Sequence, residues 1–280
     1  MYKYGMTQWV AGNEDIEVSF KRLSRLGYDS IEYASDPYSM DRKRCKDLMS
    51  RYNMQCLSLC GLFNEERDLT KPLNESENAR RYVRDSIDLA VEMGAKVLIV
   101  VPSPVGRTVI PAQLSYERAW DNAVINLKDI SKYAEDAGVT LAIEPINRYE
   151  TYLVNTIEQA SRMAKQADSK AIAIMADAFH MSIEEANIAA SVVRAGALVR
   201  HVHIADSNRA AAGMGHTDFS SLLNALNEIG YSGPLTMEFM CRTADPYAAR
   251  DISTLSEMMD GYAKISIDYM KALENGVMCR

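Results

Sequence analysis

The sequence predicts an α/β fold, a closed (β/α)8 TIM barrel that occupies residues 1–280 as a single domain. A helix–glycine–strand pattern recurs along the chain, and eight apolar strand segments can be counted, as eight βα units require. No glycine-rich phosphate-binding turn follows the first strand segment, which disfavours a dinucleotide-binding sheet. These observations together favour a barrel over an open doubly wound sheet.

The recurring pattern joins an amphipathic helix, a glycine at its end and a short apolar strand. It first reads RLSRLGYDSIEY and returns as LAVEMGAKVLIVV, YAEDAGVTLAIE, VVRAGALVRHVHIA and LNEIGYSGPLTMEF. Each glycine is placed just after a helix, where a left-handed backbone costs glycine little. The five positions are Gly27, Gly94, Gly138, Gly196 and Gly230. The apolar segments that follow are typical of strands buried on both faces.

Filling the gaps between these repeats gives a strand and a following helix in every unit. Two helix starts carry a capping-box pattern, Thr156–Gln159 and Ser182–Glu185, with a hydroxyl at the N-cap and Gln or Glu three residues later. The eight strands are expected at about residues 2–7, 29–33, 55–60, 96–101, 139–144, 172–177, 199–205 and 235–239.

Composition and charge narrow the class of protein. Hydrophobic residues make up 48% and charged residues 25%, which is ordinary for a globular domain with a sizeable core. The net charge of -7, without a compensating Lys/Arg stripe, disfavours nucleic-acid binding. There is no apolar run of roughly 18 residues and no signal-peptide pattern. The five cysteines lack zinc-type spacing. We therefore expect a cytoplasmic, reduced protein that binds no membrane.

The last four strands each end in a residue that can bind a metal ion. The segments LAIE, IMAD, HVHIAD and TMEF place Glu144, Asp177, His203 and Glu238 at the C-terminal mouth of the barrel, where catalytic groups of such barrels lie. A single strand-end acid could equally form a salt bridge or a solvated loop charge. Four in successive units instead predict one divalent-metal site, and three carboxylates with one imidazole suit Mn²⁺, Co²⁺ or Mg²⁺ better than structural zinc.

A second histidine precedes His203 by two residues. His201 lies on the same side of the strand but one layer deeper in the barrel. An H-x-H pair could supply two ligands. We favour His203, which is nearer the strand end, and interpret His201 as a hydrogen-bonded neighbour or a packed barrel residue.

Longer sequence phrases surround these residues. EPINRYE with VNT after it, MADAFHMSIEE, HVHIADSNRAAAGMGH and TMEF resemble the D-tagatose 3-epimerase / D-psicose (allulose) 3-epimerase family, within the xylose-isomerase-like sugar isomerase/epimerase barrels. The resemblance is strong over about residues 139–240. It is weaker before that, where GLFNEERDL is the most suggestive stretch.

The resemblance implies a chemistry for the matching positions. The family's metal ligands fall on the same four strand-end residues, with Mn²⁺ as the expected ion and Co²⁺ or Mg²⁺ as alternatives. Glu144 and Glu238 would also act as catalytic bases on opposite faces of a ketose. One would remove the proton beside the carbonyl to give a cis-enediolate, and the other would return a proton from the opposite face. Glu150, His180 and Arg209 would bind the sugar.

Several sites carry a structural alternative to this interpretation. Arg209 and Glu150 could form a loop ion pair, and His180 could cap or pack at the start of a helix. His216 and Asp218 are expected to order the loop after the seventh strand. Relatives are often dimers or tetramers, so a homo-oligomer is expected. Its contact surface would be the Met- and Tyr-rich region at about 249–275, unless that stripe packs on the barrel.

The sugar and the overall reaction have alternatives too. The first strand and its loop read YGMTQWVAG, with Met6, Gln8 and one aromatic residue, Trp9, which departs from the family. Arg107 could meet an anionic group or be solvated. An aldose–ketose isomerase of the hydroxypyruvate or inosose type, or a 3-keto-sugar lyase or deglycosidase, could use the same metal site. A three-zinc endonuclease needs more histidines than the four present, and a non-catalytic sugar-binding protein would not need both bases.

Overall fold

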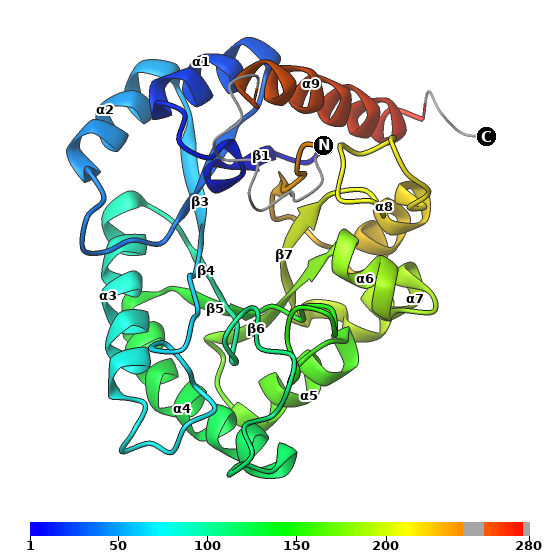
Figure 1. Ribbon diagram of the computed structural model, residues 1–280. Coiled ribbons are helices and arrows are strands. Elements are labelled where there is room, and N and C mark those ends of the chain that lie inside the picture. The colour runs from blue at the N-terminus through cyan, green and yellow to red at the C-terminus, as the bar shows by residue number, and fades with distance from the viewer. Residues whose placement is uncertain (243–254, 277–280) are drawn as a thin grey trace.

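A computed structural model describes residues 1–242 and 255–276. Parallel strands close into a barrel in chain order, and β8 pairs with β1 (Figure 1). The predicted (β/α)8 fold is therefore confirmed. The strands are β1 Tyr4–Thr7, β2 Ser30–Ala34, β3 Gln55–Cys60, β4 Val97–Val100, β5 Thr140–Ile143, β6 Ile172–Asp177, β7 Val199–Ile204 and β8 Leu235–Met237.

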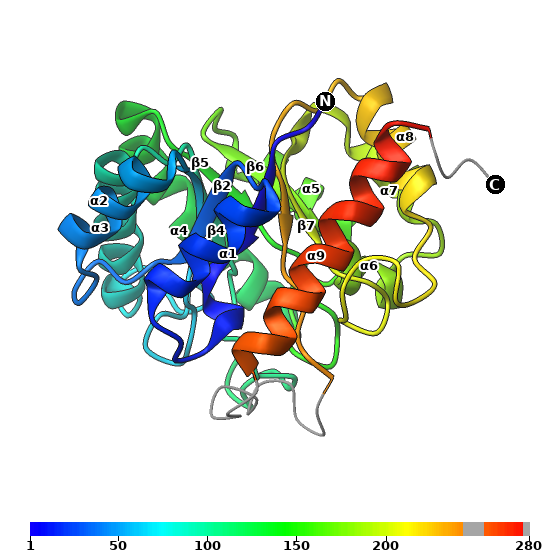
Figure 2. The ribbon, with the colours of Figure 1, turned by 90° about the horizontal axis from the view of Figure 1, so that it is seen from above.

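Helices surround the barrel as an outer layer (Figures 1 and 2). They are α1 Ile16–Leu26, α2 Arg42–Tyr52, α3 Glu77–Met93, α4 Tyr116–Ala137, α5 Ile157–Ala167, α6 Ala178–Glu184, α7 Ile188–Ala195, α8 Phe219–Glu228 and α9 Leu255–Glu274, with short 3-10 turns η1 Gln8–Ala11 and η2 Gly196–Leu198. Over the described ranges, no helix is both long and apolar enough to cross a bilayer.

The helix ends largely follow the predicted residues. All five predicted glycines have positive φ, and those after α1, α3 and α4 are left-handed caps. Asn53 and Asp168 end α2 and α5 in the same left-handed conformation. A search for glycines alone does not find such ends, because the short polar side chains of Asn and Asp also tolerate this backbone.

The two predicted capping boxes have different outcomes. Thr156 and Gln159 form the full reciprocal box at the start of α5. The prediction for Ser182–Glu185 is wrong, because Asp177 already caps α6 and the helix begins one residue later. Ser182 consequently lies inside α6, where its hydroxyl donates to a backbone carbonyl. The next helix, α7, starts from Asn187 instead.

The C-terminal helix packs against α1 beside the point where the barrel closes (Figure 2). The Met-rich stripe of α9 faces inward, with Met259, Ile267 and Met270 fully buried, so this stripe belongs to the core. Residues 249–254 of the expected contact surface lie outside the described residues. The four cysteines described, Cys45, Cys56, Cys60 and Cys241, are free and buried, as expected for Cys56 and Cys60.

A buried arginine joins α1 to α9. Arg22 donates two hydrogen bonds to Glu14, at 2.5 and 2.7 Å, and one to Asp260 of α9 at 2.5 Å. Its side chain is only 1% exposed, whereas Arg25, which binds the same Asp260, is 63% exposed. Ion pairs formed by buried groups are costly to break, because removing one partner leaves the other charge uncompensated.

We predict that Arg22→Ala lowers the free energy of unfolding by about 3–5 kcal/mol, because Glu14 loses both of its guanidinium hydrogen bonds in a buried position. Arg25→Ala is the matched control and should cost less than about 1 kcal/mol, since exposed pairs contribute little. Urea denaturation measures both values. Equal losses in the two variants would contradict this role for Arg22.

Candidate active site

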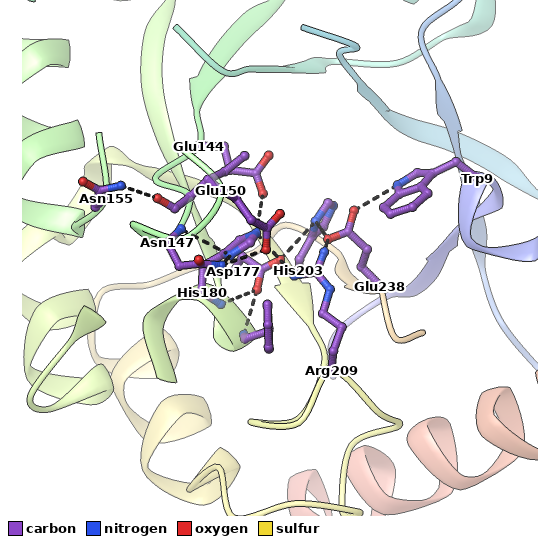
Figure 3. A network of polar contacts seen from close by, with 12 residues as sticks. Trp9, Glu144, Asn147, Glu150, Asn155, Asp177, His180, His203, Arg209 and Glu238 are labelled. Atoms are coloured by element: carbon purple, nitrogen blue, oxygen red, sulfur yellow. Dashed lines mark hydrogen bonds and ion pairs between the residues drawn. The ribbon is translucent and has the colours of Figure 1, made fainter. Parts of the chain in front are cut away.

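The four predicted strand-end residues meet at the mouth of the barrel. Glu144, Asp177, His203 and Glu238 each offer a ligand atom, and these atoms lie within 4.8 Å of one another (Figure 3). Asp177 and His203 are register partners on β6 and β7, and Glu144 and Glu238 directly follow β5 and β8. All four side chains are buried. Parallel strands of one barrel direct their C-terminal ends to the same face, which is why residues so far apart in sequence converge.

The donor atoms fit a divalent cation. His203 Nδ1 lies 3.1 Å from Glu238 Oε2 and 3.8 Å from Asp177 Oδ2. Both Nδ1 of His203 and Oδ2 of Asp177 are buried without a hydrogen-bond partner among residues 1–242 and 255–276. Orphaned buried polar atoms are costly, and three carboxylates in one small volume repel one another. A cation held by three carboxylates and one imidazole would relieve both costs.

Asp177 serves two structures with its two oxygens. Oδ1 accepts hydrogen bonds from the backbone N–H groups of Phe179 and His180, at 2.7 and 3.0 Å, and so caps α6. Oδ2 faces the candidate ligand cluster. The helix cap therefore fixes the orientation of the carboxylate.

The two candidate catalytic carboxylates lie in different environments. Glu238 accepts hydrogen bonds from Trp9 Nε1 at 3.0 Å and from Arg209 Nη2 at 2.8 Å. Burial favours the neutral form of Glu238, but His203 and Arg209 outweigh it and lower its pKa to about 2. Burial and then the charge of Glu238 raise the pKa of Glu144 well above its ordinary value. Without a cation, one carboxylate is thus held ionised while the other tends to keep a proton.

His180 is held as a neutral imidazole beside Glu144. Burial lowers its pKa to about 3. The backbone N–H of Asn147 donates to Nδ1 at 3.4 Å, and the Asn147 amide nitrogen lies 2.8 Å from the same atom. The two Asn147 donors favour Nδ1 as the acceptor and Nε2 as the N–H group; Nε2 lies 4.0 Å from Glu144 Oε1 and 3.3 Å from Arg209 Nη1, which can only donate. The Asn147 amide also donates to Glu150 at 2.9 Å, which joins two predicted substrate-binding residues through a residue that the sequence did not indicate.

Arg209 is placed by a strained turn after β7. Its φ of 60° is a left-handed conformation that residues other than glycine seldom adopt, and such strain is often found at functional sites. Its backbone carbonyl accepts from Met240 N at 2.7 Å, which ties this turn to the chain after β8. Its guanidinium lies 4.5 Å from the Phe179 ring centroid and 3.5 Å from Asp177 Oδ2. The turn thus brings a buried cation to the three carboxylates.

A cavity of about 260 Å³ opens above this cluster. Five predicted site residues line it: Glu144, Glu150, His180, Arg209 and Glu238. The rest of the lining is mainly apolar and includes Trp9, Leu62, Phe63, Val101, Val105 and Ile146. The cavity therefore combines charged and hydrogen-bonding groups with apolar surface.

Other residues that the sequence singled out lie elsewhere. The Arg107 guanidinium binds Glu65 and Asp68, with 2.6 Å to Asp68 Oδ2, and borders a different hollow. It is therefore neither solvated nor directed at the candidate site. Asp218 caps α8, and the backbone of His216 donates to Ser207, so both order the loop after β7. His201 lies outside the four-residue ligand cluster.

Sequence reasoning missed Glu32, which lies in the barrel interior beneath the site. Its Oε1 is 3.0 Å from His203 Nε2, and its Oε2 is 2.8 Å from His201 Nε2. Burial alone would raise its pKa, but the two imidazoles, His203 foremost, hold the pKa below the ordinary value. An acidic residue in the middle of the strand SIEYA was a usable signal, because a buried carboxylate requires a partner.

Comparison with known proteins places the chain in a family. Residues 20–260 match the family described as xylose isomerase-like TIM barrel. The chain belongs to this family. An L-ribulose 3-epimerase of Methylomonas sp. is 33% identical over 80% of this chain and 78% of that protein. A D-psicose 3-epimerase of Ruminiclostridium cellulolyticum is 27% identical over 96% and 95%.

A solved structure of the same family agrees in fold. A D-allulose 3-epimerase from Methylomonas sp., crystallised with D-allulose, superposes with a TM-score of 0.83 at 27% identity and covers 96% of each chain. The predicted resemblance to ketose 3-epimerases of the xylose isomerase-like barrels is therefore confirmed, and a divalent-metal site is consistent with both the relatives and the ligand cluster.

We predict that Asp177→Asn weakens Mn²⁺ binding by at least about 100-fold, since outer-shell changes alone cost 10- to 100-fold. The asparagine keeps a cap acceptor, so the stability of the metal-free protein should change by no more than about 1 kcal/mol. Asp218→Asn is the matched control, because Asp218 also caps a helix but lies outside the cluster. Calorimetric metal titration and thermal melts test this pair; equal metal affinity in both variants would exclude Asp177 as a ligand.

Proposed function

We propose that this protein is a divalent-metal-dependent ketose 3-epimerase. The observation that carries the proposal is the pair Glu144 and Glu238, which border one cavity directly above a ligand cluster that fits a cation. The 3-epimerase names of the relatives support the same reaction. An epimerase must remove a proton from one face of a carbon and return one to the other, and two carboxylates at one cavity suit that need.

The cation would be held by the four strand-end residues. We propose Mn²⁺, with Co²⁺ or Mg²⁺ as alternatives, because the set contains three carboxylates, one imidazole and no thiolate. A bound cation would supply positive charge beside two adjacent oxygens of the ketose, where negative charge develops as the carbon-bound proton leaves.

The protein groups would then divide the proton transfers. Glu144 and Glu238 both border the cavity, so one is placed to remove the proton at C3, giving a cis-enediolate, and the other to return a proton from the opposite face. In the reverse direction the two exchange roles. His180 Nε2–H and the Arg209 guanidinium can donate hydrogen bonds to substrate oxygens, and Glu150 can accept one from a hydroxyl.

The cavity favours an uncharged sugar. Among its described lining residues, Arg209 is the only cation, and it already donates to Glu238. Arg107 is bound by two carboxylates and borders a different hollow. A phosphate group would therefore meet apolar wall or carboxylates. The expected homo-oligomer, a dimer or tetramer, and the cytoplasmic location stay predictions.

We predict that incubation with D-psicose in deuterated water gives the C3 epimer with deuterium at C3, because the returned proton comes from a carboxylate in exchange with solvent. NMR measures label and epimer together. A product labelled only at a carbon other than C3 would indicate an aldose–ketose isomerase. Glu238→Gln should lower epimer formation by about 100- to 10,000-fold. Unchanged turnover by this variant, with the metal still bound, would refute the two-base scheme.

We predict that phosphorylated ketoses are turned over at least about 100-fold less efficiently than their free counterparts, since an unpaired charge in the cavity costs about 3 kcal/mol or more. A panel of free ketoses and ketose phosphates, assayed with Mn²⁺ and again after chelation, measures kcat/KM for each. Chelation should abolish turnover, and Mn²⁺ should restore it. Preference for a phosphorylated ketose would contradict the free-sugar assignment.

A further inference from the structure

A buried acid supports the candidate metal centre from below. Glu32 lies on β2, and its side chain reaches the inward face of β7 inside the closed barrel. The residue is 1% exposed, and the distance from its Oε1 to His203 Nε2 is 3.0 Å. The other ring nitrogen of His203 faces the ligand cluster, 3.1 Å from Glu238. The imidazole thus lies between a carboxylate beneath it and the candidate cation site above it.

The second oxygen of Glu32 is also occupied. Oε2 accepts a hydrogen bond from Ser58 Oγ at 2.5 Å and lies 2.8 Å from His201 Nε2. An ionised carboxylate has acceptors only, so the His203 imidazole, which is hydrogen-bonded to Glu32, is expected to present an N–H group at Nε2. When Nε2 of His203 carries the hydrogen, its Nδ1 keeps a lone pair. That lone pair points to Asp177 and Glu238.

We propose that Glu32 is a positioning residue of the candidate metal centre: it holds His203 in the Nε2–H tautomer and in the ring orientation that directs Nδ1 at the cation. Ser58 in turn donates to Glu32, and His201 Nε2 lies 2.8 Å from its Oε2. The proposal rests on the metal centre of the proposed function, although not on the identity of the sugar. It follows a general pattern, since histidine ligands of metals usually donate their second N–H to a carboxylate or carbonyl.

The same atoms could be read as a second metal site. Ligand atoms of Glu32, His201 and His203 lie within 4.8 Å of one another. Two observations favour the hydrogen-bonded reading. Ser58 donates to the carboxylate, and His203 Nε2 makes a contact of ordinary hydrogen-bond length with it, at 3.0 Å, whereas both ring nitrogens of His201 lack a hydrogen-bond partner among the described residues. An ion there would also require His203 to bind metal through both nitrogens, which means removing its last N–H. The number of metal ions bound per chain separates the two readings.

The tautomer can be measured on the unaltered protein. The chain has only four histidines, so ¹⁵N-histidine labelling gives a small set of ring signals, and a His203→Gln variant assigns one of them. In the protein loaded with diamagnetic Mg²⁺, at neutral pH, we expect His203 to carry its hydrogen on Nε2. A hydrogen on Nδ1 would overturn the proposal. This measurement needs no variant of Glu32, so it remains decisive if such a variant fails to fold.

The variant Glu32→Gln tests the consequence for metal binding. Glutamine has one acceptor oxygen and a donor amide, so it cannot replace the carboxylate that accepts from both Ser58 and His203. We expect Mn²⁺ binding, measured by calorimetry, to weaken by about 10- to 100-fold, and the His203 ring signals to shift toward the Nδ1–H form. The wild type should bind one Mn²⁺ per chain.

A matched control separates positioning from stability. Asp68 is a buried carboxylate that accepts hydrogen bonds from Thr70 and Arg107 and borders a different hollow. Asp68→Asn should change the melting temperature and leave Mn²⁺ affinity within about twofold. If Glu32→Gln also leaves affinity within twofold, the proposal fails. The proposal also fails if the wild type binds two Mn²⁺ ions per chain and Glu32→Gln binds one, because Glu32 would then be a ligand of a second ion. None of these readouts uses a ketose, so they stand apart from any failure of the epimerase assay.

Discussion

Three carboxylates share one buried point at the mouth of this barrel, and their mutual repulsion determines what must surround them. The nearest groups reduce it: Arg209 and the Trp9 indole donate to Glu238, and His203 lies between Glu238 and Asp177. These groups come from the first strand's turn, from β7 and from the turn after β7, so the cluster depends on closure of the whole barrel. An open sheet would separate η1 from Glu238 and remove one of its donors.

The sequence predicted the elements well where the signal is local. Strand positions follow from short apolar runs, and strand ends bring the candidate ligands together because every parallel strand of a barrel points the same way. The prediction of the second capping box failed because Ser182 resembles an N-cap residue, whereas the N-cap of α6 is Asp177, five residues earlier. No sequence pattern indicated that a candidate metal ligand would also cap this helix. Prediction also failed across the barrel, since no spacing rule relates Glu32 to His203, 171 residues away.

The polar and the apolar residues that line the cavity come from different parts of the chain. Residues after β5 to β8 and on α6 supply its charged and hydrogen-bonding groups, whereas its apolar wall comes mainly from η1 and from the segments that follow β3 and β4. The resemblance to known epimerases was strongest in the later strands and weakest in the earlier ones. This difference matches the division of the site: proton transfer requires particular groups in particular places, whereas an apolar wall can be rebuilt from many side chains of similar volume.

The two-sided use of Asp177 links local folding to ion occupancy. One oxygen holds the first turn of α6 and the other faces the ligand cluster, so any free energy from binding an ion at Oδ2 also favours the conformation in which Oδ1 caps the helix. Ligands that bind only the folded form stabilise it by mass action. The helix carrying His180 would then be most firmly docked in the loaded protein, and its amide protection would report on occupancy even without substrate. Binding of the ion and ordering of α6, the helix that carries His180, are therefore thermodynamically coupled.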